Sequence, residues 1–136
     1  LIGVVLIPEK NQLWISNGRK SWCESRDGTY LKTNLMQNKS RIHDMTLVTS
    51  KNHRNQTLQK VIEKLNFKDQ IVMGSVGCKI ASILRGESNI YICLSLPDKS
   101  STNDWNFAPE VILKNDDGSL TSLNNHKLAF VGSNFE

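Results

Sequence analysis

Apolar residues form short, closely spaced runs in the first part of the chain, a pattern typical of β-strands. The run from Leu1 to Ile7 is rich in branched residues and stops at Pro8. A polar stretch, 9–12, separates it from a second apolar segment, 13–16. Two strand-like runs joined by a short polar turn predict a β-hairpin.

Two further turn signals follow this hairpin, at Asn17-Gly18 and at Asp27-Gly28. Residues 21–24 lie between them and are expected to continue the antiparallel meander. Residues 31–44 are polar and poorly patterned, so we expect a surface connection there.

The pattern changes after residue 44, where strand-like and helix-like segments alternate. Leu58, Val61, Ile62 and Leu65 have the spacing of the apolar stripe of an amphipathic helix. Further helices are predicted at 78–84, closed by Arg85-Gly86, and at 109–114, with Pro109 in the first turn. Strands are predicted at 45–49, 70–73, 89–94, 119–121 and 127–131, with a loop at 97–103.

Alternating strands and helices imply βαβ crossovers and a largely parallel sheet. The predicted fold class is therefore α/β, with a leading β-hairpin and a C-terminal mixed sheet flanked by helices. We expect two parts: residues 1–44, which end a first sheet layer, and residues 45–136, an α/β subdomain that binds substrate. Ligands of such sheets lie beyond the carboxyl ends of the strands.

Composition narrows the class of protein. The chain is 38% hydrophobic and 22% charged, and no apolar run approaches the roughly 20 residues of a membrane span. The net charge of +4 is mild and its basic residues are scattered, so no nucleic-acid polymer is expected as a partner. Two alternatives stay open for these residues: a solvated surface, or a local positive field for a phosphorylated small molecule.

Three cysteines without paired spacing argue against a disulfide framework and a zinc site. They favour a reducing compartment, and we expect a cytoplasmic protein. The chain opens on Leu1 within an apolar run, which we interpret as truncation. An open apolar strand edge there would favour association with a second copy.

The segment from Met73 to Lys79 is a candidate phosphate cradle. Gly74 and Gly77 would let backbone N–H groups approach an anion, Ser75 offers a hydroxyl, and Lys79 supplies charge. The alternative is a strand-to-helix turn in which Ser75 is an N-cap and Lys79 lies in solvent. The spacing is not that of a P-loop.

Ser50 and His53 follow the predicted strand 45–49. A histidine beyond a strand end could stack on a base or hydrogen-bond to a sugar. The alternative is an exposed loop in which Asn55 or Gln56 opens the next helix.

The segment 104–113 reads Asp-Trp-Asn-Phe-Ala-Pro-Glu-Val-Ile-Leu. It resembles the WDxAAPE-VIL segment of the inositol monophosphatase superfamily, in its 3'(2'),5'-bisphosphate nucleotidase branch. Upstream segments resemble other family motifs in the family's order, over about residues 1–130. They are the GVVxxP hairpin at 3–8, the S-x-S-H substrate loop at 50–53 and the GSxxxK helix at 74–79.

The resemblance implies a layered sugar-phosphatase fold and Mg²⁺-dependent hydrolysis of phosphomonoesters, with carboxylates that hold the metal. Most of those carboxylates, and the catalytic residues, are expected upstream of residue 1. The family's metal-binding aspartate corresponds to Asn106, with Asp104 as the fallback. The expected substrate-binding residues are Ser50, His53, Gly74, Ser75, Gly77 and Lys79.

By this resemblance, the expected reaction removes the 3'-phosphate of adenosine 3',5'-bisphosphate. Alternatives are an inositol or sugar phosphatase, and a catalytically dead binding or structural domain. We expect the chain to be inactive alone. Some nucleotidases of the family have an arginine at a position that falls near Cys93 in this chain, so the contact of that arginine with phosphate is missing here. Residues 24–29 mimic the family's DPxDGT motif, but we predict that they form a hairpin turn.

Overall fold

The computed structural model describes residues 2–31, 33, 41–51, 55–94, 107–115, 118–122 and 124–126. The predicted loop 97–103 and strand 127–131 lie outside this part of the chain, and so do His53, Asp104 and Asn106. The described strands are β1 (Gly3–Ile7), β2 (Gln12–Ser16), β3 (Ser21–Ser25), β4 (Tyr30–Leu31), β5 (Thr46–Ser50), β6 (Asp69–Met73) and β7 (Ile90–Tyr91). The described helices are α1 (Gln56–Leu65), α2 (Val76–Leu84) and α3 (Phe107–Lys114), with short 3-10 helices at Pro8–Lys10 and Ile42–Asp44.

Strands β1 to β4 form an antiparallel sheet in sequence order, so the predicted hairpin and meander are confirmed. Pro8 ends β1, and Asn11 takes the positive φ of 52° that closes the turn into β2. Val5, Trp14 and Cys23 lie side by side across three strands. Trp14 and Cys23 are buried there, so this face of the sheet forms one wall of a core.

The turn between β3 and β4 is the segment that mimics a metal-binding motif. The Ser25 amide donates to the Thr29 carbonyl at 2.9 Å, and Gly28 has a φ of 82°. Its position at a hairpin tip confirms the prediction of a structural turn.

Strands β5, β6 and β7 form a parallel sheet in the order β6-β5-β7. Helix α1 connects β5 to β6, and α2 connects β6 to β7. Crossovers between parallel strands are right-handed. The first runs from the central strand β5 to β6, and the second runs in the opposite direction, from β6 past β5 to β7, so the two helices cover opposite faces of the sheet. The predicted βαβ arrangement is confirmed, although β7 is shorter than the predicted strand 89–94.

Helix α1 buries its apolar stripe against one face of this sheet. Leu58 and Ile62 pack with Leu47 of β5 and with Phe67. Asn55 caps the helix, since its side-chain oxygen accepts a 2.7 Å hydrogen bond from the Leu58 amide. The interpretation in which Asn55 opens the helix is therefore confirmed.

Helix α2 ends as the sequence predicted, at Arg85 and at Gly86 with a φ of 75°. The Arg85 guanidinium forms a 2.7 Å ion pair with Glu87 and donates to Gln12 of β2 at 3.1 Å. This bridge ties the carboxyl end of α2 to the antiparallel sheet.

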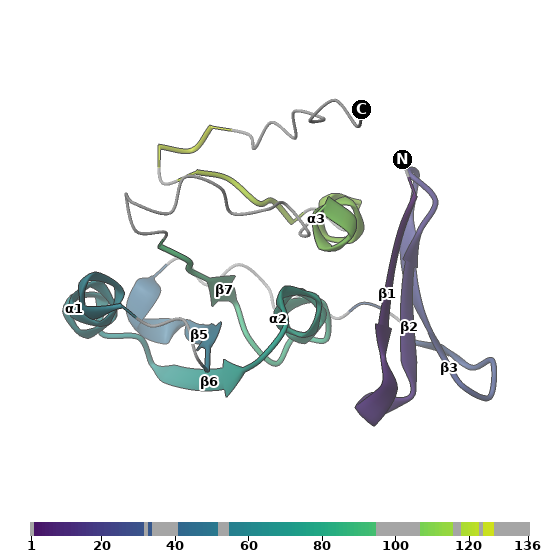
Figure 1. The fold of residues 1–136 in the computed structure, drawn as a ribbon, viewed down its shortest axis with the longest axis horizontal. Helices are drawn as coiled ribbons and strands as arrows, with labels where there is room; N and C mark the ends of the chain where they lie inside the picture. Colours follow the sequence, from purple (N-terminus) through teal and green to yellow (C-terminus); the bar gives the residue numbers. More distant parts are fainter. Residues whose placement is uncertain are drawn as a thin grey trace, which may run out of the picture.

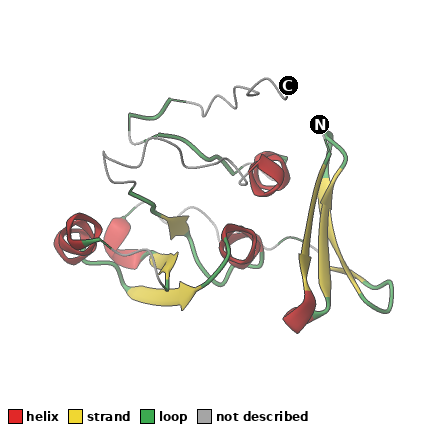
Figure 2. Cartoon of the chain, in the orientation of Figure 1, coloured by secondary structure: helices red, strands yellow, loops and turns green. Residues whose placement is uncertain are grey.

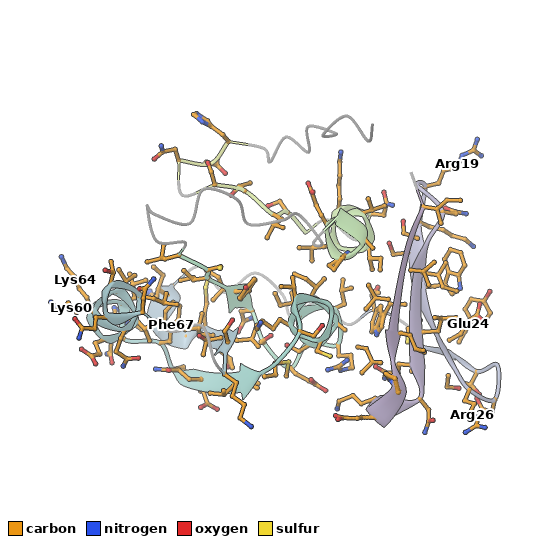
Figure 3. All side chains as sticks on the ribbon, viewed as in Figure 1. Arg19, Glu24, Arg26, Lys60, Lys64 and Phe67 are labelled. Atoms are coloured by element: carbon orange, nitrogen blue, oxygen red, sulfur yellow. The ribbon has the colours of Figure 1, made fainter. Side chains whose placement is uncertain are left out.

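Helices α2 and α3 lie between the two sheets, while α1 covers the outer side of the parallel sheet (Figures 1 and 2). Helix α2 contacts β1 on one side and both β5 and β7 on the other. The mixed α/β fold class is thus confirmed, whereas the division into 1–44 and 45–136 stays a prediction. Charged residues labelled in Figure 3 project outward: Lys60 and Lys64 from α1, and Arg19, Glu24 and Arg26 from the antiparallel sheet. Within the described ranges, each helix is too short or too polar to cross a membrane.

Candidate functional site

Strand pairing decides which side chains of the parallel sheet face α2. Leu47 of β5 pairs with Ile90 of β7, and both pack on the α1 side. Side chains alternate along a strand, so the next pair, Val48 and Tyr91, points to the opposite face, toward α2. Ser50, two residues beyond Val48, shares that face at the carboxyl end of β5.

Lys79 extends from α2 over this face of the sheet. Its side chain is buried, with 3% of its surface exposed, and its Nζ lies 5.0 Å from the centroid of the Tyr91 ring. Among the residues that the structure describes, no carboxylate pairs with this ammonium group. Burial lowers the pKa of Lys79, while the thiols of Cys93 and Cys78 act in the opposite direction. Within the described part of the chain, the site therefore holds a buried cation without a carboxylate counter-ion.

Tyr91 forms the floor beneath this cation. Burial raises the pKa of its phenol to about 12; the Cys93 thiol adds to the rise, and a hydrogen bond with Ser50 opposes it. The phenol is consequently neutral at physiological pH and does not act as a counter-ion. Ser50, Tyr91 and Lys79 together present two hydroxyl groups and one positive charge.

The amino end of α2 begins just before Lys79, at an unusual backbone position. Ser75 has a φ of 39° and a ψ of 133°, which L-residues rarely adopt. Ser75 occupies the N-cap position of α2, as the alternative had it, but its side chain makes no capping hydrogen bond. The first-turn N–H groups of α2 thus lack a side-chain acceptor from Ser75 and carry partial positive charge.

Gly77 is buried for a reason that the sequence could not reveal. A Cβ added there would lie 2.7 Å from Cγ1 of Val5, in β1. Close packing between α2 and the first sheet therefore requires this glycine. Gly74 differs, because a Cβ added at that position would meet no atom within 4 Å.

The structure brings Ser50 and Lys79 together through Tyr91, and it puts Gly74, Ser75 and Gly77 at the start of the helix that carries Lys79. The alternative in which Lys79 lies in solvent is wrong. Sequence reasoning missed Tyr91, whose only signal was an aromatic residue in a predicted strand. The roles of all these residues, and of His53, Asp104 and Asn106 outside the described ranges, stay predictions.

The described residues do not by themselves fit a magnesium site. They contain no group of three or more His, Cys, Asp or Glu side chains able to hold a metal ion. Glu110, in the first turn of α3, has one buried carboxylate oxygen without a hydrogen-bond partner. Burial raises the pKa of this carboxyl, and Lys114 opposes the rise.

Comparison with known proteins identifies the fold and the family. The family model described as inositol monophosphatase family matches residues 1–134. Comparison with curated protein sequences gives no significant match. Cys23, Cys78 and Cys93 are free thiols.

Solved structures of inositol monophosphatase II from Staphylococcus aureus are similar to this chain, with 20% identity and a TM-score of 0.70. Structures of this staphylococcal enzyme with 2'AMP and with inositol monophosphate bound give the same identity and TM-score. The match covers 93% of this chain and 46% of the first of these, so the chain spans about half their length. The bisphosphate nucleotidase branch stays a prediction. The match over residues 1–134 shows that the chain belongs to the inositol monophosphatase family.

Proposed function

We propose that this chain supplies the substrate-binding part of a phosphomonoester hydrolase, and that Lys79 binds a phosphate group of the substrate. The single observation that carries the proposal is the buried Lys79 ammonium, which has no carboxylate partner among the described residues. An unpaired buried cation is costly unless a bound anion compensates it. Phosphate supplies that charge, and the amino end of α2 would add N–H donors for its oxygens.

The proposed substrate is adenosine 3',5'-bisphosphate, which would lose its 3'-phosphate. Two anionic groups on one nucleotide would suit an enzyme in which the expected metal site binds one of them and Lys79 binds the other. His53 would stack on or hydrogen-bond to the nucleoside, and the resemblance assigns Ser50, Gly74, Ser75 and Gly77 to substrate binding as well. The second candidate is an inositol or sugar phosphate. The staphylococcal enzyme supports both candidate substrate classes, since its structure was solved with 2'AMP and with inositol monophosphate.

Binding of three anions by residues 1–136 tests the phosphate proposal: inorganic phosphate, adenosine 3',5'-bisphosphate and inositol monophosphate, each followed by NMR titration. Lys79→Met should weaken binding about 10- to 100-fold, the usual range for loss of a charge-assisted contact. Lys64→Met is the matched control, because Lys64 projects from the outer side of α1 (Figure 3). Equal affinity in folded Lys79→Met and in the unaltered chain would overturn the proposal.

We also propose that the complete enzyme uses Mg²⁺, as the family generally does, and that residues 1–136 release little phosphate alone. Two arguments support the low activity of residues 1–136. The resemblance assigns most metal-binding carboxylates to a segment ahead of residue 1, and Asn106 offers a neutral oxygen where the family has an anion. Phosphate release by purified 1–136 that depends on Mg²⁺ would contradict the proposal. A catalytically dead binding domain is the alternative, and it predicts anion binding without hydrolysis in any context.

Association between copies is a separate proposal, and it rests on β1. This strand is an edge of the described antiparallel sheet, and Val4 and Leu6 are 53% and 63% exposed. An apolar edge strand of this kind favours pairing with another strand. Light scattering across protein concentrations tests it: Leu6→Lys should reduce association, and a monomer at all concentrations would refute it.

The free cysteines support a reducing compartment, so we propose a cytoplasmic location.

A further inference from the structure

We infer that Tyr91 is the positioning residue of the anion site, where its ring holds the Lys79 ammonium over the carboxyl edge of the parallel sheet. This assignment rests on the proposed function, because it concerns how the phosphate-binding cation is presented. Tyr91 belongs to none of the family motifs that identified the other site residues.

The geometry of the pair supports direct stabilisation by the ring. The 5.0 Å between Nζ and the ring centroid lies inside the roughly 6 Å at which a cation and an aromatic ring attract. The ring is fixed in turn, since Tyr91 pairs with Val48 in the parallel ladder and its hydroxyl lies against Ser50. A rigid strand thus supports a long and otherwise flexible side chain.

The ring differs from a carboxylate in one property that matters for binding. A carboxylate partner would hold Lys79 but would neutralise its charge before any ligand arrived. An aromatic face attracts the ammonium through its quadrupole and carries no net charge, so the cation keeps its full charge for an anion. Holding a lysine in place before binding also reduces the entropy that the ligand must overcome.

Three variants separate the ring from the hydroxyl and from general damage. Tyr91→Phe keeps the ring, and we expect phosphate affinity to change less than about twofold. Tyr91→Leu removes the ring, and affinity should fall about 3- to 30-fold. Tyr30→Leu is the matched control, because Tyr30 is the chain's other tyrosine, is 66% exposed and lies in the other sheet.

A second readout distinguishes positioning from mere support of the fold. The Lys79 titration can be followed in the ligand-free chain by NMR of its Cε group. The ring stabilises the charged form, so Tyr91→Leu should move the titration to lower pH, while Tyr91→Phe should leave it in place. Loss of stability alone would not shift this midpoint.

Inorganic phosphate and adenosine 3',5'-bisphosphate are the ligands for the affinity measurements. Normal phosphate affinity in folded Tyr91→Leu, together with an unmoved Lys79 titration, would overturn the inference. So would equal losses in Tyr91→Phe and Tyr91→Leu, which would assign the effect to the hydroxyl. If neither anion binds the unaltered chain but Tyr91→Leu still moves the titration, the proposed function fails and the contact with Lys79 stands.

Discussion

A methyl group of Val5 fills the space in which a side chain at position 77 would begin. An added Cβ at Gly77 would lie 2.7 Å from Val5 Cγ1, nearer than real Cβ contacts come. The first sheet therefore contacts the first turn of α2, the helix that carries Lys79. This contact connects the packing of β1 to the position of the candidate site.

Gly77→Ala should destabilise the chain by about 1–3 kcal/mol, because the added methyl group overpacks the contact between β1 and α2. Urea unfolding measures the change. Val5→Ala provides the control, since shortening Val5 should recover part of the loss in the double variant. Additive effects of the two substitutions would contradict the steric explanation.

Ser75→Gly should have the opposite effect on stability. Glycine adopts the positive φ of residue 75 without the penalty that a Cβ imposes, which outweighs its greater freedom in the unfolded chain. We expect a gain of about 1 kcal/mol in thermal or urea unfolding. Gly74→Ala, one residue earlier, should change stability little, since its Cβ would meet open space.

Ser75→Gly also tests the role of the Ser75 hydroxyl. If this hydroxyl contacts a bound phosphate, Ser75→Gly should weaken phosphate binding as it stabilises the fold. A variant that is less stable than the unaltered chain would mean that residue 75 is not strained.

The secondary structure was largely predictable because it depends on local signals. The stripe at Leu58 and Ile62 indicated α1, the Arg85-Gly86 pair indicated the end of α2, and Asn17-Gly18 indicated a hairpin turn. Each acts within a few residues, through side-chain periodicity or backbone freedom. The shortening of β7 was not predictable, because apolar residues beyond a strand look the same in sequence as those within it.

The stability effect of Lys79 should depend on pH. Burial favours its neutral form and lowers the folded-state pKa below that of an unfolded lysine, 10.5. Below the folded-state pKa the charged side chain therefore costs stability, and this cost declines as pH rises toward 10.5. Although the Tyr91 ring attracts the ammonium, the net direction of the pKa shows that burial dominates.

Lys79→Met should accordingly raise the urea midpoint at pH 7, and its advantage over the unaltered chain should shrink by pH 10. Urea unfolding at both pH values checks this, with Lys64→Met as the control. An advantage that grows with pH would show that the sign of the Lys79 effect is wrong.

Asn55 is expected to stabilise α1 and its connection to β7. Its oxygen accepts from the Leu58 amide at 2.7 Å, and its amide group donates to the Leu94 carbonyl at 3.1 Å. Asn55→Ala should cost about 1–2 kcal/mol in urea unfolding. Gln56→Ala, at the exposed first helical residue, serves as the comparison, and equal effects of the two would exclude a capping role.

Contacts between distant segments explain why the candidate site was only partly predictable. Gly77 was assigned to a phosphate cradle because two neighbouring glycines permit close approach of an anion. Its steric partner, Val5, lies in the first predicted hairpin, and no local signal connects the two. Tyr91 escaped notice for the same reason, since only the pairing of β7 with β5 turns its ring toward Lys79.

The burial of α2 on two sides also constrains the order in which the chain can fold. Its contacts with β5 and β7 join segments close in sequence, whereas its contact with β1 closes a loop of about seventy residues. Because long loops form late, the βαβ unit should collapse first and the antiparallel sheet should dock onto it. Until that docking, Ile80 and Leu84 of α2 would be exposed. Pulse-labelled hydrogen exchange during refolding should then show protection in β5 and β6 before it appears in β1.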